Sequence, residues 1–250
     1  MFLTPISPEH QFFRESLRSF IKKEILPHID QWESEGKIDK AIWRKMGEMG
    51  YLGLNFPEEY GGLDLDFYYS LIFCEELSHC FSGGFTISVL VTEYMSAPYL
   101  LKYGSAFLKE KYLSKVITGE LISAIAITEP GAGSDVQNIK TTATDEGDYY
   151  LVNGSKTFIT NGYYGDFYIT AVKTDPKAGS SGISLLLIDR ESEGLTTNKI
   201  QKLGWHASDT AELAFDNVKV PKDHLIGELG KGFKYLMGGL QLERLTAAIH

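Results

Sequence analysis

One glutamate near the end of the chain is a candidate for proton transfer. Glu243 lies in the segment Leu240-Gln-Leu-Glu-Arg-Leu245. A carboxylate can take a proton from a carbon atom when it lies within about 3 Å of that atom and is shielded from water. The same glutamate beside Arg244 would also fit an exposed charge pair on a helix. These two residues alone leave both interpretations open.

A glycine-containing loop is a second candidate, for binding phosphate groups. The run Ile125-Ala-Ile-Thr-Glu-Pro-Gly-Ala-Gly-Ser-Asp135 leads from a strand-like segment into Gly131, Gly133 and Ser134. Glycine permits close approach and positive φ, so backbone amides beside a serine hydroxyl can hold a pyrophosphate. An ordinary turn between two strands would show the same glycines. The run is not a Rossmann fingerprint, because it lacks the third glycine and opens no helix.

The segments that must position these residues are of two kinds, and the first is helical. Apolar residues recur at helical spacing from Ser7 to about Ser34, with Ser7 as N-cap and Pro8 at the first helical position. Similar patterns run along residues 39–49, 66–79, 86–103 and 105–118. We therefore expect residues 1–120 to form an all-helical N-terminal domain.

The second kind of segment is β structure, which begins at Leu121. From there the residues follow the two-residue alternation that is typical of β-strands. The next hundred or so residues are rich in Thr, Tyr, Val and Ile. Turn signals such as Asn153-Gly154 interrupt them. Several short strands with regular turns favour a barrel or a sandwich. Residues 121–226 are therefore expected to form an antiparallel, β-barrel-like middle domain.

Residues 227–250 return to a helical pattern. Phe233, Leu236 and Leu240 carry its apolar face. No C-cap, Gly or Pro ends this pattern before the last residue. The sequence thus predicts an α+β multidomain protein in which a C-terminal helical bundle is begun and then truncated.

Composition limits the class of protein. Of the 250 residues 43% are apolar, and the formal net charge is −9. These values favour a soluble globular protein and argue against a nucleic-acid-binding surface. No apolar run reaches the roughly 18 residues of a membrane span, and Met1–Pro5 resembles neither a signal nor a transit sequence. We expect a cytoplasmic protein without a membrane span.

Metal sites, disulfides and other common catalytic motifs are not indicated. Cys74 and Cys80, six residues apart on a predicted helix, point in different directions. The six histidines show no metal-ligand spacing. There is no Gly-x-Ser-x-Gly elbow and no P-loop, which argues against a serine hydrolase or a nucleoside triphosphatase.

Four longer motifs resemble those of the acyl-CoA dehydrogenase family. The most specific is Thr-Glu-Pro-Gly-Ala-Gly-Ser-Asp at residues 128–135, and the others span residues 50–62, 152–162 and 203–213. Residues 240–245 resemble the segment that carries the catalytic glutamate in the long-chain and isovaleryl subfamilies. Most other members carry the base in the C-terminal domain. The resemblance covers nearly the whole chain and implies FAD as cofactor and an acyl-CoA thioester as substrate.

The resemblance also implies which residues contact the cofactor. Eight are expected to do so: Ile125, Ile127, Thr128, Gly133, Ser134, Phe158, Ile159 and Thr160. Thr128 and the backbone of Ile127 would contact the flavin ring, and Thr160 would form a hydrogen bond near its reactive edge. Most relatives have tryptophan where this chain has Phe158, so stacking would persist without the indole N–H.

Catalytic and substrate-binding roles follow from the same resemblance. Glu243 would take the α proton of the thioester while a hydride passes from the β carbon to the flavin. Ser134 would lie by phosphate or pantetheine groups, and Arg244 would lie near the CoA moiety. Gln241 is a further expected substrate contact, at a place where some relatives have aspartate.

The implied activity is α,β-dehydrogenation of acyl-CoA to trans-2-enoyl-CoA in fatty acid β-oxidation, with electrons passed to an electron-transfer flavoprotein. The full-length assembly would be a homotetramer. Acyl-CoA oxidases and flavin monooxygenases share this middle domain and stay open as alternatives. A non-catalytic acyl-CoA-binding fragment is a third, because the helical bundle that completes the flavin site in the family is missing.

Overall fold

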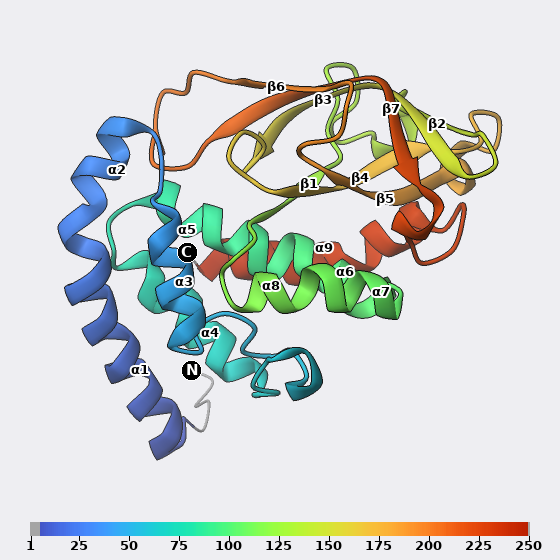
Figure 1. Cartoon of the computed structure of the whole chain (residues 1–250). Coiled ribbons are helices and arrows are strands. Elements are labelled where there is room, and N and C mark those ends of the chain that lie inside the picture. The colour runs from blue at the N-terminus through green and yellow to red at the C-terminus, as the bar shows by residue number, and fades with distance from the viewer. Residues whose placement is uncertain (1–5, 250) are drawn as a thin grey trace.

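The computed structural model of the protein describes residues 6–249. Residues 1–5, on which the leader prediction rests, and His250, one of the six histidines, lie outside this range. Within it, a helical domain, a sheet-rich domain and a C-terminal helix follow one another along the chain (Figure 1). This order confirms the fold class predicted from the sequence.

The helical domain consists of short α-helices joined by π- and 3-10-helical turns. The α-helices are α1 (Pro8–Phe20), α2 (Ile29–Glu35), α3 (Lys40–Glu48), α4 (Phe67–Ser78), α5 (Gly83–Leu90), α6 (Ala97–Tyr103), α7 (Ala106–Leu108) and α8 (Ser114–Ile117). The π-helical segments are η1 (Ile21–Ile25), η4 (Val91–Ser96) and η5 (Lys109–Leu113). The helix predicted from Ser7 to Ser34 is thus interrupted around Pro27, where proline cannot supply a backbone N–H.

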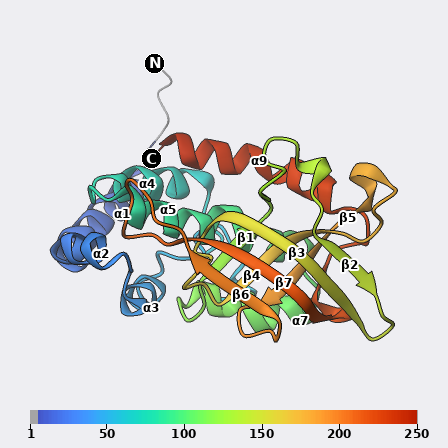
Figure 2. The same ribbon diagram turned by 90° about the horizontal axis from the view of Figure 1, so that it is seen from above.

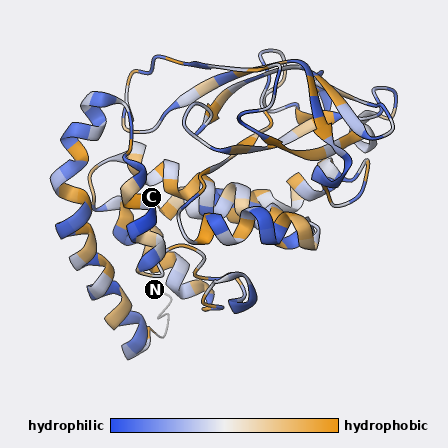
Figure 3. Cartoon of the chain, viewed as in Figure 1, coloured by the Kyte–Doolittle hydropathy of each residue, from blue (hydrophilic) through white to orange (hydrophobic). Residues whose placement is uncertain are grey.

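Side-chain caps fix where several helices begin. Ser7 Oγ accepts a hydrogen bond from the His10 N–H, and His10 Nδ1 accepts one from the Ser7 N–H. Asp39, Asp66 and Ser82 cap α3, α4 and α5 with a side-chain oxygen. Such residues satisfy the free N–H groups of a first helical turn. The N-cap predicted at Ser7 is confirmed. Figure 3 shows hydrophilic and hydrophobic residues alternating along α1, as expected of a helix with one face on the core.

Eight strands within residues 6–249 form one sheet in the order β6-β7-β3-β2-β4-β5-β8, with β1 also paired to β4. Their bounds are β1 (Ser123–Ala126), β2 (Thr142–Asp145), β3 (Tyr149–Thr160), β4 (Phe167–Lys173), β5 (Ile183–Asp189), β6 (Leu195–Lys199), β7 (Thr210–Pro221) and β8 (Leu225–Ile226). β1 and β2 run parallel to β4, and the other pairs are antiparallel. The sheet is mainly antiparallel, as predicted, with a parallel section that residue alternation did not indicate.

The strand β4 is buried on both faces and joins the sheet to the helices. Phe167, Ile169 and Ala171 pack against residues of the helical domain. Tyr168 and Val172 pack on the opposite side, with residues of β3 and β7. Successive side chains of a strand point to opposite faces, so one strand contributes to both cores.

The C-terminal helix α9 (Gly232–Ile249) contacts both domains. It packs against α4, α5, η4 and α6 of the helical domain and against β5 of the sheet. Figure 2 shows it running from the β5 side of the molecule toward α4. The segment η4 in turn contacts both α9 and β1. One helical segment therefore lies against the elements that carry the predicted base and the predicted cofactor contacts.

Buried polar groups fasten the end of β3 to the helical domain. Asn161 Nδ2 donates to the Ser88 carbonyl oxygen at 2.9 Å, and Ser88 Oγ donates to Asn161 Oδ1 at 2.5 Å. The same amide nitrogen donates to Thr92 Oγ1 and to the Ser123 carbonyl oxygen, both at 3.2 Å. The φ of Asn161 is 60°, which asparagine tolerates better than most residues. Because Thr160 directly precedes it, these bonds fix Thr160 relative to α5 and η4.

Two further findings concern membrane spans and the cysteines. Within residues 6–249 no helix has both the length and the apolar character needed to cross a bilayer. Cys74 and Cys80 are free and buried, and burial raises the pKa of the Cys74 thiol to about 12. A thiol in that state stays protonated and unreactive at neutral pH.

Candidate active site

Phe158 is held in an unusual conformation on β3. The pairing of β3 with β7 shifts register between Lys156 and Ile159, so Phe158 lies in a β-bulge. Its φ is 60°, and 67% of its surface is exposed. The left-handed region costs a non-glycine residue about 1–2 kcal/mol, and bulges often re-aim a side chain beside a functional site. The ring of Phe158 is therefore open to contact from a ligand.

Other predicted cofactor contacts lie on β1, on the segment that directly follows β1, and on β3. The Thr157 N–H donates to the Thr128 carbonyl oxygen at 2.9 Å, which brings the two segments together beside the bulge. Four of these residues keep partly exposed side chains: Ile125, Ile127, Thr128 and Thr160. Ile159 packs inside the sheet core, so it could contact a ligand only through its backbone.

The glycine loop leaves its outer side open. Glu129 and Ala132 exchange two backbone hydrogen bonds, which close a tight turn. A Cβ atom at Gly131 or Gly133 would meet no atom within 4 Å, and neither residue has a positive φ. The chain itself therefore does not require glycine here, whereas a ligand lying against the backbone would. Ser134 is exposed beside them. These features fit a phosphate-bearing group.

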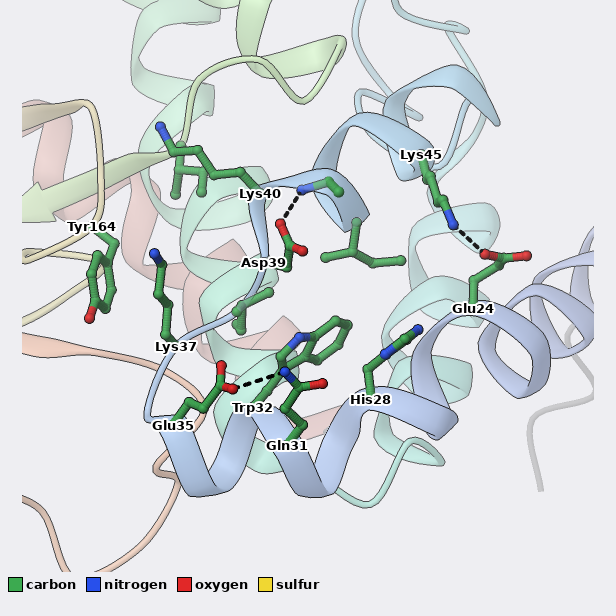
Figure 4. Close-up of a pocket in the computed structure, with 14 residues that line it drawn as sticks. Glu24, His28, Gln31, Trp32, Glu35, Lys37, Asp39, Lys40, Lys45 and Tyr164 are labelled. Carbon is green, nitrogen blue, oxygen red and sulfur yellow. Dashed lines mark hydrogen bonds and ion pairs between the residues drawn. The ribbon is translucent and has the colours of Figure 1, made fainter.

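A small cavity adjoins this loop, and a larger one lies elsewhere. The first has a volume of about 230 Å³ and is lined in part by Gly131 and Lys140. The second, of about 680 Å³, lies between α2, α3 and Tyr164 (Figure 4). Glu24 and Lys45 form an ion pair of 2.6 Å on its wall. None of the residues predicted for cofactor, substrate or catalysis lines the larger cavity.

A buried ion pair supports the glycine loop from behind. Lys156 Nζ lies 2.8 Å from Glu129 Oε1, and both side chains are almost fully buried. The backbone N–H groups of Lys140 and Thr141 donate to the Glu129 carboxylate at 2.5 and 3.0 Å. Burial favours the neutral form of Glu129, but the charge of Lys156 and these hydrogen bonds outweigh it and lower its pKa. Glu129 is therefore an ionised anchor for the loop.

Glu243 faces the helical domain rather than solvent. Tyr99, on α6, donates a hydrogen bond from its hydroxyl to Glu243 Oε1 at 2.7 Å. Burial raises the pKa of Glu243, while the Tyr99 hydrogen bond and the charge of Arg244 oppose that effect. No ion pair between Glu243 and Arg244 is found within residues 6–249. The inward position favours a reactive carboxylate over an exposed charge pair.

The other predicted substrate contacts on α9 are exposed. Gln241 and Arg244 both face solvent. Within the described part of the chain, no hydrogen bond or ion pair joins Gln241, Glu243 or Arg244 to the glycine loop or to Phe158. The structure thus brings the predicted contacts on β1 and β3 together, and separately places Glu243 of α9 with Tyr99.

The sequence interpretation missed Tyr99, Glu129 and Lys156. Glu129 and Lys156 stand inside the quoted motifs, and a charged residue amid strand-like apolar runs is a signal that it needs a buried partner. Tyr99 carries no comparable signal, because a tyrosine on an apolar helix is usually a core residue.

Comparison with known protein families assigns the class. The family model "Acyl-CoA dehydrogenase, N-terminal domain" matches residues 7–120, and "Acyl-CoA dehydrogenase, middle domain" matches residues 124–218. The chain therefore belongs to the acyl-CoA dehydrogenase family, whose members are oxidoreductases.

Individual relatives agree with this class. The mitochondrial long-chain specific acyl-CoA dehydrogenase of Mus musculus is 41% identical over 247 residues, covering 97% of this chain and 56% of the relative. The crystal structure of an acyl-CoA dehydrogenase from Geobacillus kaustophilus is 49% identical with a TM-score of 0.95, covering 98% of this chain and 65% of that one. An acyl-CoA dehydrogenase from Bacillus anthracis, solved in complex with FAD, is 32% identical with a TM-score of 0.90, covering 98% of this chain and 41% of that one. The chain thus spans little more than half the length of the curated mouse relative.

Proposed function

We propose that this protein functions as an FAD-dependent dehydrogenase of acyl-CoA thioesters, with Glu243 as the catalytic base. The position of Glu243 carries the proposal: its carboxylate is turned inward from α9 and held by Tyr99, in a chain of the acyl-CoA dehydrogenase family. Partial burial raises the pKa of that carboxyl. A stronger base that is shielded from water suits the removal of a proton from carbon.

The residues around the bulge and the glycine loop fit FAD. Bound FAD would supply the acceptor for the hydride that leaves the β carbon of the substrate. Phe158 would lie against the flavin ring, since its side chain is exposed and has a strained φ. Thr128 and Thr160 offer hydroxyl groups for its edge, and the open backbone from Gly131 to Ser134 would receive the pyrophosphate. The Bacillus anthracis relative with FAD supports this choice of cofactor.

Glu243 would take the α proton of the bound thioester, which yields a trans-2-enoyl-CoA once the β hydride has left. Arg244, exposed on the next position of α9, would pair with CoA phosphate groups. Gln241 would contribute a neutral hydrogen-bonding group to the same moiety. These assignments rest on the motif match and on the exposure of both side chains.

Partners and domain limits extend the same proposal to the whole protein. Electrons would pass to an electron-transfer flavoprotein in fatty acid β-oxidation, and the assembly would be a homotetramer in the cytoplasm. The domains would span residues 1–120, 121–226 and 227–250, the last being the first part of a helical bundle.

The test is a visible spectrum of the purified 250-residue chain, recorded anaerobically before and after a panel of acyl-CoA thioesters is added. The expected result is a yellow flavin band that bleaches with at least one chain length. Glu243→Gln should retain the band and lose the bleaching. Arg44→Gln, which changes an exposed residue of α3, is the control and should bleach normally.

Three outcomes would contradict the proposal in different ways. A flavin that stays unbleached with every thioester would remove the dehydrogenase assignment. Rapid reoxidation of the bleached, product-bound flavin by air would indicate an oxidase. A folded but colourless protein after reconstitution with FAD would show that the residues named here do not form a cofactor site in this chain.

A further inference from the structure

The hydrogen bond between Tyr99 and Glu243 treats the two carboxylate oxygens differently. The Tyr99 hydroxyl donates to Oε1 at 2.7 Å, and only 3% of the Tyr99 surface is exposed. Within residues 6–249 Oε2 has no hydrogen-bond partner, and it is not among the fully buried oxygens that lack one. One oxygen is therefore held by the protein and the other is available.

The helix α9 is shaped to receive the Tyr99 hydroxyl. A Cβ atom at Gly239, one turn before Glu243, would overlap the Tyr99 hydroxyl oxygen and lie 3.0 Å from Glu243 Oε1. Any residue larger than glycine would push the phenol away. One turn further along α6, Tyr103 stacks on Tyr235 of α9 with ring centroids 3.8 Å apart. Two tyrosines on one face of α6 thus fix its position against α9, and one of them reaches the carboxylate.

We propose that Tyr99 is a positioning residue for Glu243: its hydroxyl holds Oε1 against α6 and leaves Oε2 as the atom that accepts the proton. The catalytic meaning of this arrangement rests on the proposed function, whereas the arrangement itself does not. In the proposed reaction the α C–H bond would break, its proton would form an O–H bond at Oε2, and its electron pair would stay on carbon to form the double bond while the β hydride passes to FAD, the acceptor in the proposed function.

The electrostatics agree with this division of roles. Burial raises the pKa of Tyr99, and the neighbouring Glu243 charge raises it further, so the phenol keeps its proton and remains a donor. Burial raises the pKa of Glu243, and Tyr99 and Arg244 are the groups that oppose this rise. Without the Tyr99 hydroxyl, the carboxylate would lose a hydrogen bond that favours its ionised form.

The experiment is a pH titration of the Glu243 side-chain carboxyl by carbon NMR in the chain labelled with ¹³C-glutamate, without thioester. The signal is assigned by its loss in Glu243→Gln. In Tyr99→Phe the pKa of Glu243 should rise by about 1 to 2 pH units, which corresponds to the loss of one hydrogen bond to a charged group. Tyr103→Phe is the matched control, because it removes the same atom one turn away and keeps the stack on Tyr235. It should leave the titration unchanged.

A second variant removes the bond while retaining the tyrosine. Gly239→Ala should reproduce the raised pKa of Glu243, because the added methyl group displaces the phenol. Thermal melting shows which variants are folded under the conditions of the titration. An unmoved pKa in folded Tyr99→Phe or Gly239→Ala, or an equal rise in Tyr103→Phe, would overturn the positioning role.

The titration separates this inference from the proposed function. If the pKa shifts as expected but no thioester bleaches the flavin, Tyr99 positions a carboxylate that is not the base of this reaction. If thioesters do bleach the flavin, the acid limb of the pH profile for bleaching should move upward in Tyr99→Phe and stay in place in Tyr103→Phe. A structural role alone would lower the melting temperature without moving that limb.

Discussion

Lys156 and Glu129, which lie 27 positions apart in the chain, form a buried ion pair of 2.8 Å that joins two of the motifs. Lys156 comes from the β3 motif that also carries Phe158, and Glu129 directly follows Thr128 at the start of the glycine loop. Lys156 Nζ also donates to the Ile127 carbonyl oxygen at 3.0 Å. One side chain thus fixes the loop and the bulge relative to each other.

Removing one member of this ion pair should strongly lower the stability of the folded protein. Lys156→Met leaves the Glu129 charge buried without its cation, so we expect a loss of about 3 kcal/mol in the free energy of unfolding. Urea denaturation measures it. Lys23→Met is the control, since Lys23 is largely exposed and pairs with Glu24 at 3.3 Å. Its cost should stay within about 0.5 kcal/mol. Equal costs for the two variants would contradict the anchoring role.

Local patterns predicted the elements well because helix and strand periodicity depend on neighbouring residues. The N-cap at Ser7, the change to β structure after Leu121 and the final helix all follow from a few residues of sequence. The parallel pairing of β1 with β4 did not follow, because it depends on how residues 123 and 167 meet in space.

Only the parts of the site that lie within recognisable sequence motifs could be predicted. The bulge at Phe158 arises from a register shift against β7, a partner strand some 50 residues later in the chain. No local sequence pattern predicts it. Tyr99 and Glu243 are 144 positions apart, and their contact depends on the docking of α6 on α9. Such pairings are set by tertiary packing, which a single sequence does not display.

The adjacent glycines of α9 should respond in opposite directions to the same substitution. At Gly238 an added Cβ meets nothing closer than 3.9 Å, so Gly238→Ala should gain about 0.5–1 kcal/mol from helix propensity. At Gly239 the Cβ would overlap the Tyr99 hydroxyl. Gly239→Ala should therefore be less stable than the natural chain, even though alanine brings the same gain in helix propensity. Thermal melting of both variants tests the pair, and stabilisation by both would refute the close packing at Gly239.

Glu93 should give the stability of the protein an unusual dependence on pH. The side chain is buried on η4, Oε2 accepts the Gly53 N–H at 2.7 Å, and Oε1 is buried without a partner. Burial raises its pKa from 4.5 to about 7. Between these values the folded protein holds a proton that the unfolded chain has released. The stability contributed by Glu93 is therefore full below about pH 4.5 and is lost as the pH rises to about 7.

The change over that range is on the order of 3 kcal/mol. Glu93→Gln cannot titrate, so its stability relative to the natural chain should improve by that amount between about pH 5 and about pH 8. Urea denaturation at the two pH values gives the comparison, and taking the difference cancels the titration of other groups. A difference between the two proteins that is the same at both pH values would show that Glu93 is already ionised in the folded state.

Replacing Phe158 by glycine should stabilise the folded chain and weaken its binding of FAD. Its φ of 60° strains the backbone, so Phe158→Gly should raise the free energy of unfolding of the flavin-free chain by about 1 kcal/mol. The same change removes the ring that would stack on the flavin, so FAD should bind about fivefold more weakly, corresponding to about 1 kcal/mol. Flavin fluorescence titration measures the second effect.

Phe81, also at φ 60° and 84% exposed, is the matched control. Phe81→Gly should give the same gain in stability and leave FAD affinity unchanged, whereas an unchanged affinity in Phe158→Gly would show that the bulge does not present this ring to the cofactor.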